Sequence, residues 1–135
     1  YTGNALASAA AIANLEIFEK ERTIEKLGPK ILTLQKLLKE FHGLDHVGDV
    51  RQRGLMIGIE LVQDKKTKKR FPASARLGHR VCKLAREKGI IIRPLGDTIV
   101  LMPPLSITGA ELKRLCKVVY GAIDLLSSDY GKPVD

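Results

Sequence analysis

The chemically most informative side chain in this sequence is Arg93, which follows a run of three isoleucines at residues 90–92. Pro94 and a Gly-Asp pair separate this run from a second apolar run at residues 98–102. The pattern predicts a hairpin of two buried strands, with Arg93 at the end of the first. A guanidinium stays charged at every working pH, so a position beside a buried strand is costly unless an anion meets the charge.

The planar fork of an arginine matches a carboxylate through two parallel hydrogen bonds. Arg93 is therefore a candidate for binding a carboxylate at the rim of a site. The local pattern leaves one alternative open, in which Arg93 forms an internal ion pair with an acidic residue of the same domain.

The rest of the sequence predicts the elements that would hold Arg93 in place. Apolar side chains recur at helical spacing in four segments, and two further segments have the pattern of strands. We expect helices at residues 4–21, 23–42, 74–88 and 108–127, and strands at residues 47–53 and 55–62. Together with the hairpin, this order predicts a two-layer α+β sandwich whose small sheet is mostly antiparallel.

Particular residues mark where these helices begin. Asn4 is a suitable N-cap for the first helix, and Thr108 with Glu111 forms a capping box before the last. Gly28 and Pro29 predict a kink or a restart near the beginning of the second helix. The first helix carries an apolar stripe that would pack against another element: Leu6, Ala9, Ala10, Ala13, Ile17 and Phe18.

Two further arginines lie on the first predicted strand. Arg51 and Arg53 alternate with Gln52, so both would point to the same face of the sheet. We expect structural ion pairs there, with Asp49 or Glu60 as the partner, rather than a ligand-binding role.

The composition limits the class of protein. The chain has 135 residues, of which 44% are hydrophobic and 28% charged, and this suffices for one globular domain with its own core. No apolar run approaches membrane-spanning length, and no signal peptide is recognisable. We therefore expect no membrane partner.

The net charge of +8 would suit a nucleic-acid-binding protein. However, five of the basic residues lie at residues 65–70, where a charge run predicts a solvated loop. Aromatic residues make up only 4% of the chain and Trp is absent, so the chain has few side chains on which bases could stack. We expect no nucleic-acid partner.

Cys82 and Cys116 fall on apolar positions of predicted helices and have no metal-ligand spacing. We expect buried free thiols, as is typical of a protein in the reducing cytoplasm. The three histidines form no motif, because Gly43 would end the helix between His42 and His46. We expect no metal site.

Three blocks of sequence, at residues 1–11, 50–61 and 90–104, together resemble the C-terminal part of class III pyridoxal-phosphate aminotransferases. The resemblance extends to about residue 126. It implies the small domain of fold type I pyridoxal-phosphate enzymes at residues 1–127, followed by a flexible tail at residues 128–135. Since the chain opens with Tyr1 rather than Met, we expect it to be a piece of a longer protein.

The Ile-Arg-Pro and Leu-Met-Pro-Pro combination in residues 90–104 is most similar to the biotin-synthesis branch of this family. That resemblance implies transfer of an amino group to the keto carbon of 8-amino-7-oxononanoate, which gives 7,8-diaminononanoate. The usual donor is S-adenosylmethionine, although some relatives use lysine. The resemblance assigns to Arg93 the binding of the oxononanoate carboxylate.

The family's cofactor is pyridoxal 5'-phosphate, whose Schiff-base lysine and main binding residues lie upstream of a chain like this one. No lysine here has that sequence context. The resemblance therefore implies a large domain as partner, a cytoplasmic homodimer at full length, and no catalytic residue in this chain, which alone would be inactive. Two alternatives stay open: a class III enzyme acting on an ω-amino acid, and a non-catalytic basic binding module.

Overall fold

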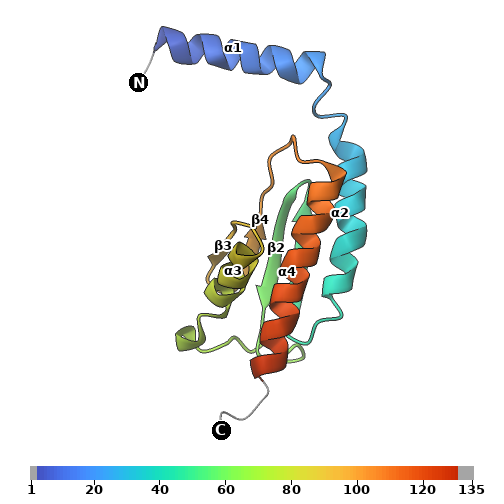
Figure 1. The fold of residues 1–135 in the computed structure, drawn as a ribbon, viewed down its shortest axis with the longest axis vertical. Helices are drawn as coiled ribbons and strands as arrows, with labels where there is room; N and C mark the ends of the chain where they lie inside the picture. Colours follow the sequence, from blue (N-terminus) through green and yellow to red (C-terminus); the bar gives the residue numbers. More distant parts are fainter. Residues whose placement is uncertain (1–2, 131–135) are drawn as a thin grey trace.

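The computed structural model describes residues 3–130. The elements are α1 (Ala5–Lys20), α2 (Leu27–Phe41), β1 (Val47–Arg53), β2 (Met56–Leu61), a short 3-10 helix η1 (Ala73–Ala75), α3 (Leu77–Glu87), β3 (Arg93–Leu95), β4 (Thr98–Leu101) and α4 (Gly109–Tyr130). The four strands form one antiparallel sheet in the order β1-β2-β4-β3. Helices α2, α3 and α4 pack over one face of it (Figure 1). The predicted α+β class is confirmed.

The two central strands explain why the sheet has one covered face. In β2 the odd-numbered residues are buried, whereas Met56 at its start is 52% exposed. In β4 the same alternation buries Ile99 and Leu101. These side chains meet the apolar faces of the helices and form one core. Its fully buried large members are Phe41, Leu34, Ile57, Ile59, Leu61, Leu77, Ile99, Leu101, Leu112, Ile123, Val47 and Val62.

Helix α1 lies apart from the rest of the fold (Figure 1). It begins as predicted, because Asn4 Oδ1 accepts a hydrogen bond from the backbone N–H of Ala7 at 3.0 Å. However, no residue of Ala5–Lys20 is buried, and Leu6 is 81% exposed. The stripe that the sequence predicts to pack against another element therefore has no such partner among residues 3–130.

Helix α2 begins at Leu27, four residues later than predicted, after turns at residues 21–26. Arg22 adopts the left-handed conformation there, with φ of 52°. The interruption predicted at Gly28 and Pro29 is thus the beginning of the helix. Pro29 lies in the first turn, where its missing N–H costs no intrahelical hydrogen bond.

Helix α4 begins at the predicted capping box. The backbone N–H of Thr108 donates to Glu111 Oε2 at 2.8 Å, and the backbone N–H of Glu111 donates to Thr108 Oγ1 at 3.2 Å. The hydrogen bond from the Thr108 backbone holds the pKa of the Glu111 carboxyl below its ordinary value. The helix continues to Tyr130, so residues 128–130 of the predicted tail are helical, and residues 131–135 lie outside the described residues.

Both cysteines are buried free thiols, as the sequence predicts. Desolvation raises the pKa of the Cys116 thiol to about 11 and also raises that of Cys82. Among residues 3–130 there is no helix with the length and apolar composition needed to cross a membrane. The same residues contain no group of three or more metal-ligating side chains placed to hold an ion.

Candidate functional site

The hairpin that carries Arg93 lies at one edge of the sheet. Within residues 3–130, strand β3 pairs only with β4, and a two-residue turn with Gly96 at φ of +60° joins them. The prediction of two buried strands is wrong for the first one, because Ile91 is 82% exposed and Arg93 begins the strand rather than ending it. Pro94 has no N–H to donate, which suits an edge position and limits the strand's length.

The register of the sheet places two arginines in one row. Arg93 pairs with Val100, which pairs with Gly58, which pairs with Arg51. Directly paired residues of neighbouring strands point to the same face of a sheet, so both guanidinium groups belong to the face opposite the helices. No element of residues 3–130 covers that face.

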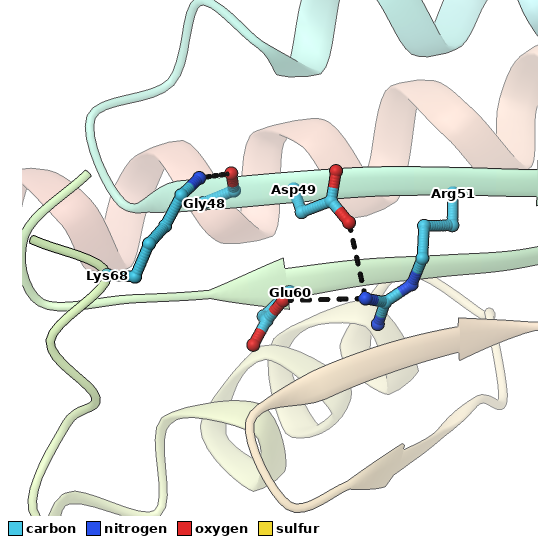
Figure 2. Close-up of polar contacts among 5 residues, drawn as sticks. All are labelled: Gly48, Asp49, Arg51, Glu60 and Lys68. Carbon is cyan, nitrogen blue, oxygen red and sulfur yellow. Dashed lines mark hydrogen bonds and ion pairs between the residues drawn. The ribbon is translucent and has the colours of Figure 1, made fainter. Parts of the chain in front are cut away.

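Arg51 is the paired arginine of this row. Its Nη1 lies 3.2 Å from Asp49 Oδ2 and 3.7 Å from Glu60 Oε2, and Figure 2 shows the guanidinium reaching both carboxylates. Asp49 and Glu60 are themselves cross-strand partners, so Arg51 offsets the repulsion of two like charges. The predicted ion pairing is confirmed for Arg51, whereas Arg53 makes no ion pair among residues 3–130. A Cβ on Gly58 would lie 4.0 Å from Arg51 Nη2, an ordinary contact distance, so the ion pairs do not depend on a glycine there.

Arg93 has a different environment. Its side chain is exposed, and its guanidinium makes no hydrogen bond or ion pair within the described part of the chain. The alternative of an internal ion pair therefore finds no acidic partner in residues 3–130. The guanidinium has all its donors available to an anion from outside this part of the protein.

Arg93 also lines a groove of about 1020 Å³, formed by residues 89–93, residues 100–104 and the beginning of α4. Most of the lining side chains are apolar. Two of the charged ones are engaged elsewhere: Glu111 caps α4, and Arg114 Nη2 donates to the backbone oxygen of Lys88 at 3.0 Å. An apolar groove with an unpaired arginine among its lining residues is suited to an aliphatic carboxylic acid.

The lysine-rich segment at residues 65–70 is more structured than the sequence suggests. Most of it is exposed, as predicted, but Lys65 is half-buried. Lys65 Nζ donates to the backbone oxygens of His42 at 2.7 Å and Leu44 at 3.0 Å, directly after α2. Lys68 Nζ donates to the backbone oxygen of Gly48 (Figure 2). These two lysines tie the loop to the fold, so a purely solvated loop is the wrong description.

The comparison with protein families places the whole chain rather than this groove. The family model described as aminotransferase class-III matches residues 1–123. The chain belongs to the class III aminotransferase family. Its sheet, with three helices on one face, is the small α+β domain of such enzymes, as the sequence predicts.

Individual members of the family are similar over most of this chain. A Nitratidesulfovibrio vulgaris protein named adenosylmethionine-8-amino-7-oxononanoate aminotransferase is 56% identical over 123 residues, 91% of this chain and 23% of the relative. The crystal structure of the Methanocaldococcus jannaschii enzyme of that name has a TM-score of 0.90 at 53% identity, covering 93% of this chain and 28% of the other. A structure described as the PMP-bound form of an aminotransferase from Vibrio fluvialis has a TM-score of 0.84 at 25% identity, covering 88% and 26%.

This chain thus spans about a quarter of the length of the curated relatives it matches. Class III aminotransferases use pyridoxal phosphate, which is held through a lysine amine. Every lysine among residues 3–130 is exposed or half-buried, and none lines the groove beside Arg93. The described residues therefore do not fit the cofactor's attachment site.

Sequence reasoning missed two residues that hold the hairpin. The sequence pattern indicates only a turn at Asp97 and no particular role for Gly78. In the structure the backbone N–H of Gly78 donates to Asp97 Oδ1 at 3.2 Å. The sequence carries no clear sign of this contact, because nineteen residues separate the two and each is unremarkable in its own segment.

Proposed function

We propose that this chain is the C-terminal small domain of an aminotransferase of biotin synthesis that converts 8-amino-7-oxononanoate to 7,8-diaminononanoate. The amino donor would be S-adenosylmethionine and the cofactor pyridoxal 5'-phosphate. Relatives at 50–56% identity that carry the corresponding name support this proposal. Another class III aminotransferase acting on an ω-amino acid is the competing assignment.

In this proposal Arg93 binds the carboxylate of the oxononanoate. The observation that carries it is the contrast within one row of the sheet, where Arg51 is neutralised by two carboxylates and Arg93 has none. A substrate carboxylate would supply the missing charge through two hydrogen bonds. The apolar walls of the groove would contact the aliphatic chain of the acid.

The full-length protein would be a cytoplasmic homodimer in which the large domain supplies the cofactor lysine. Helix α1 is evidence for a large partner domain, since residues 5–15 contain no charged side chain and all of them are exposed. A helical segment that has no charged face is ordinarily enclosed by protein. The buried free thiols support a reducing compartment.

The test uses Arg93→Ala in the full-length enzyme, with each half-reaction followed by stopped-flow absorbance. Removing one partner of a buried charged pair typically costs about 2–5 kcal/mol. We expect kcat/KM for the oxononanoate to fall by roughly two to three powers of ten. The half-reaction with the donor should change much less. Arg93→Lys should restore only part of the loss, because an ammonium lacks the planar fork.

Arg51→Ala is the matched control, since it removes an arginine from the same face that already has protein partners. It should leave the oxononanoate half-reaction close to wild type. Equal losses in both half-reactions of Arg93→Ala, together with a lower melting temperature, would contradict the carboxylate role. A full-length enzyme that aminates ω-keto acids faster than the oxononanoate would favour the competing assignment.

A further inference from the structure

The first turn of α3 sits directly on the β3–β4 turn. A Cβ built on Gly78 would lie 2.3 Å from the backbone oxygen of Gly96, 2.9 Å from Pro94 Cβ and 3.3 Å from Asp97 Cα. Real side chains do not approach a carbonyl oxygen that closely, so only glycine permits this contact. The contact also involves Pro94, the residue directly after Arg93.

A hydrogen bond joins the same two segments. Helix α3 begins after Arg76, which adopts the left-handed conformation at φ of 45° and provides no side-chain cap. Asp97, which belongs to the hairpin, caps the helix instead. Its Oδ1 accepts a hydrogen bond from the backbone N–H of Gly78 at 3.2 Å. A carboxylate at this end of a helix is also favoured by the helix dipole.

The backbone of Asp97 is fixed as well. Its carbonyl oxygen accepts from the N–H of Leu61, at the end of β2, at 2.9 Å. The turn is therefore held by the sheet through its backbone and by α3 through the side chain of Asp97. Strand β3 itself has only three residues and a single neighbouring strand, so it depends on such contacts for its place.

We propose that Gly78 and Asp97 are positioning residues, which fix the β3–β4 turn against α3 and thereby set the place of the Arg93 guanidinium. The proposal rests on the carboxylate role of Arg93 given above. A bidentate hydrogen bond requires a guanidinium in one position and orientation, and a displacement of about 1 Å can reduce a rate by roughly 10²-fold. Neither residue needs to touch the substrate.

The experiment compares Gly78→Ala, Asp97→Ala and Asp97→Asn in the full-length enzyme. Gly78→Ala must push the turn away from α3, and we expect the KM for the oxo acid to rise by about tenfold or more. Asp97→Ala should act in the same direction, and Asp97→Asn should recover part of the loss, because an amide oxygen also accepts from the Gly78 N–H. The donor half-reaction should remain near wild type in all three.

Gly121→Ala in α4 is the matched control, because a Cβ there meets no atom within 4 Å. It should leave both KM values unchanged. Thermal unfolding of each variant identifies any that fails to fold, and Asp97→Asn, which keeps the shape of the side chain, then carries the test.

A double-mutant cycle separates positioning from general stability. In the Arg93→Ala background, Gly78→Ala should add almost nothing to the loss for the oxo acid, because the group it displaces is already gone. Likewise, the methyl ester of the oxo acid should be insensitive to Gly78→Ala. Additive losses, or an equal effect on acid and ester, would overturn the positioning role. If Arg93→Ala itself shows no selective loss, the carboxylate proposal fails instead.

Discussion

Helices α1 and α4 are both long and rich in apolar residues, yet only α4 takes part in the core. Helix α4 buries one or two side chains in each turn between residues 112 and 126: Leu112, Leu115, Cys116, Val119, Ala122, Ile123 and Leu126. Helix α1 buries none along Ala5–Lys20. The difference lies in how the apolar residues are distributed around each helix.

In α4 the apolar residues recur at spacings of three and four, and Lys113 and Lys117 lie on the solvent side. One apolar surface can cover such a helix, and in α4 that surface faces α2 and α3. In α1, residues 5–15 are uncharged on every side, so packing against one surface would still leave apolar area in water. The comparison shows that a helix without a polar face needs enclosure, which the described residues do not provide.

The largest expected effect compares leucine truncation in the two helices of the isolated chain. Leu112 is fully buried, so Leu112→Ala should lower the free energy of unfolding by about 2–5 kcal/mol. Leu15 is 63% exposed, so Leu15→Ala should change it by no more than about 0.5 kcal/mol. Urea denaturation followed by circular dichroism measures both. A comparable loss for Leu15→Ala would show that α1 already packs on the rest of the chain.

The N-caps give a smaller contrast of the same kind. Thr108→Ala removes the cap of the packed helix and should cost about 1 kcal/mol of global stability. Asn4→Ala removes an equally well-formed cap from α1, but α1 is not part of the cooperative core. It should reduce helix content without moving the urea midpoint. A shift of the midpoint by Asn4→Ala would mean that both helices unfold as one unit.

The sequence predicts much of the fold because most of its signals are local. The Thr108–Glu111 capping box, the Asn4 cap and the alternation in β2 each act within a few residues, and each appears where expected. The ion pairs of Arg51 were predictable for a related reason. Asp49 is on the same strand, and a hairpin brings Glu60 opposite it.

The remaining features depend on contacts between distant segments. The sequence places Arg93 correctly in a hairpin but cannot show that β3 is an exposed edge strand, because strand order is a property of the whole sheet. The contact of Lys65 with the end of α2 and that of Asp97 with Gly78 likewise join segments about twenty residues apart. The stripe on α1 predicts a packing face, but no element among residues 3–130 buries it.

The carboxyl end of a packed helix provides a further test. Lys65 donates to two backbone oxygens directly after α2, where a positive charge is also favoured by the helix dipole. Lys65→Ala should lower the free energy of unfolding by about 0.5–1 kcal/mol. Lys69→Ala, in the same charge run but with an exposed side chain, should have no measurable effect. Equal effects of the two substitutions would show that Lys65 does not stabilise the fold more than the other lysines of the loop.

The last prediction, an effect that is absent at neutral pH, concerns the thiol that α4 places in the core. Burial raises the pKa of Cys116 to about 11 from an ordinary value of 9.0. Below pH 8 the thiol is protonated in both folded and unfolded chains, so it contributes no pH dependence. As the pH rises through the unfolded pKa, only the unfolded state loses the proton, so stability falls and continues to fall until the pH reaches the folded pKa.

The contribution of Cys116 to the pH dependence of stability is measured from the urea midpoints of wild type and Cys116→Ala at intervals from pH 7 to 10.5. The alanine variant has a lower urea midpoint by the same amount at every pH, because the loss of buried volume does not depend on pH. The raised pKa of Cys82 is common to both proteins, so its contribution cancels in the difference. The wild-type curve should therefore fall toward that of the variant above pH 9. Parallel curves would mean that α4 does not shield Cys116 from water, and would weaken its contrast with α1, which has no titratable group in a core.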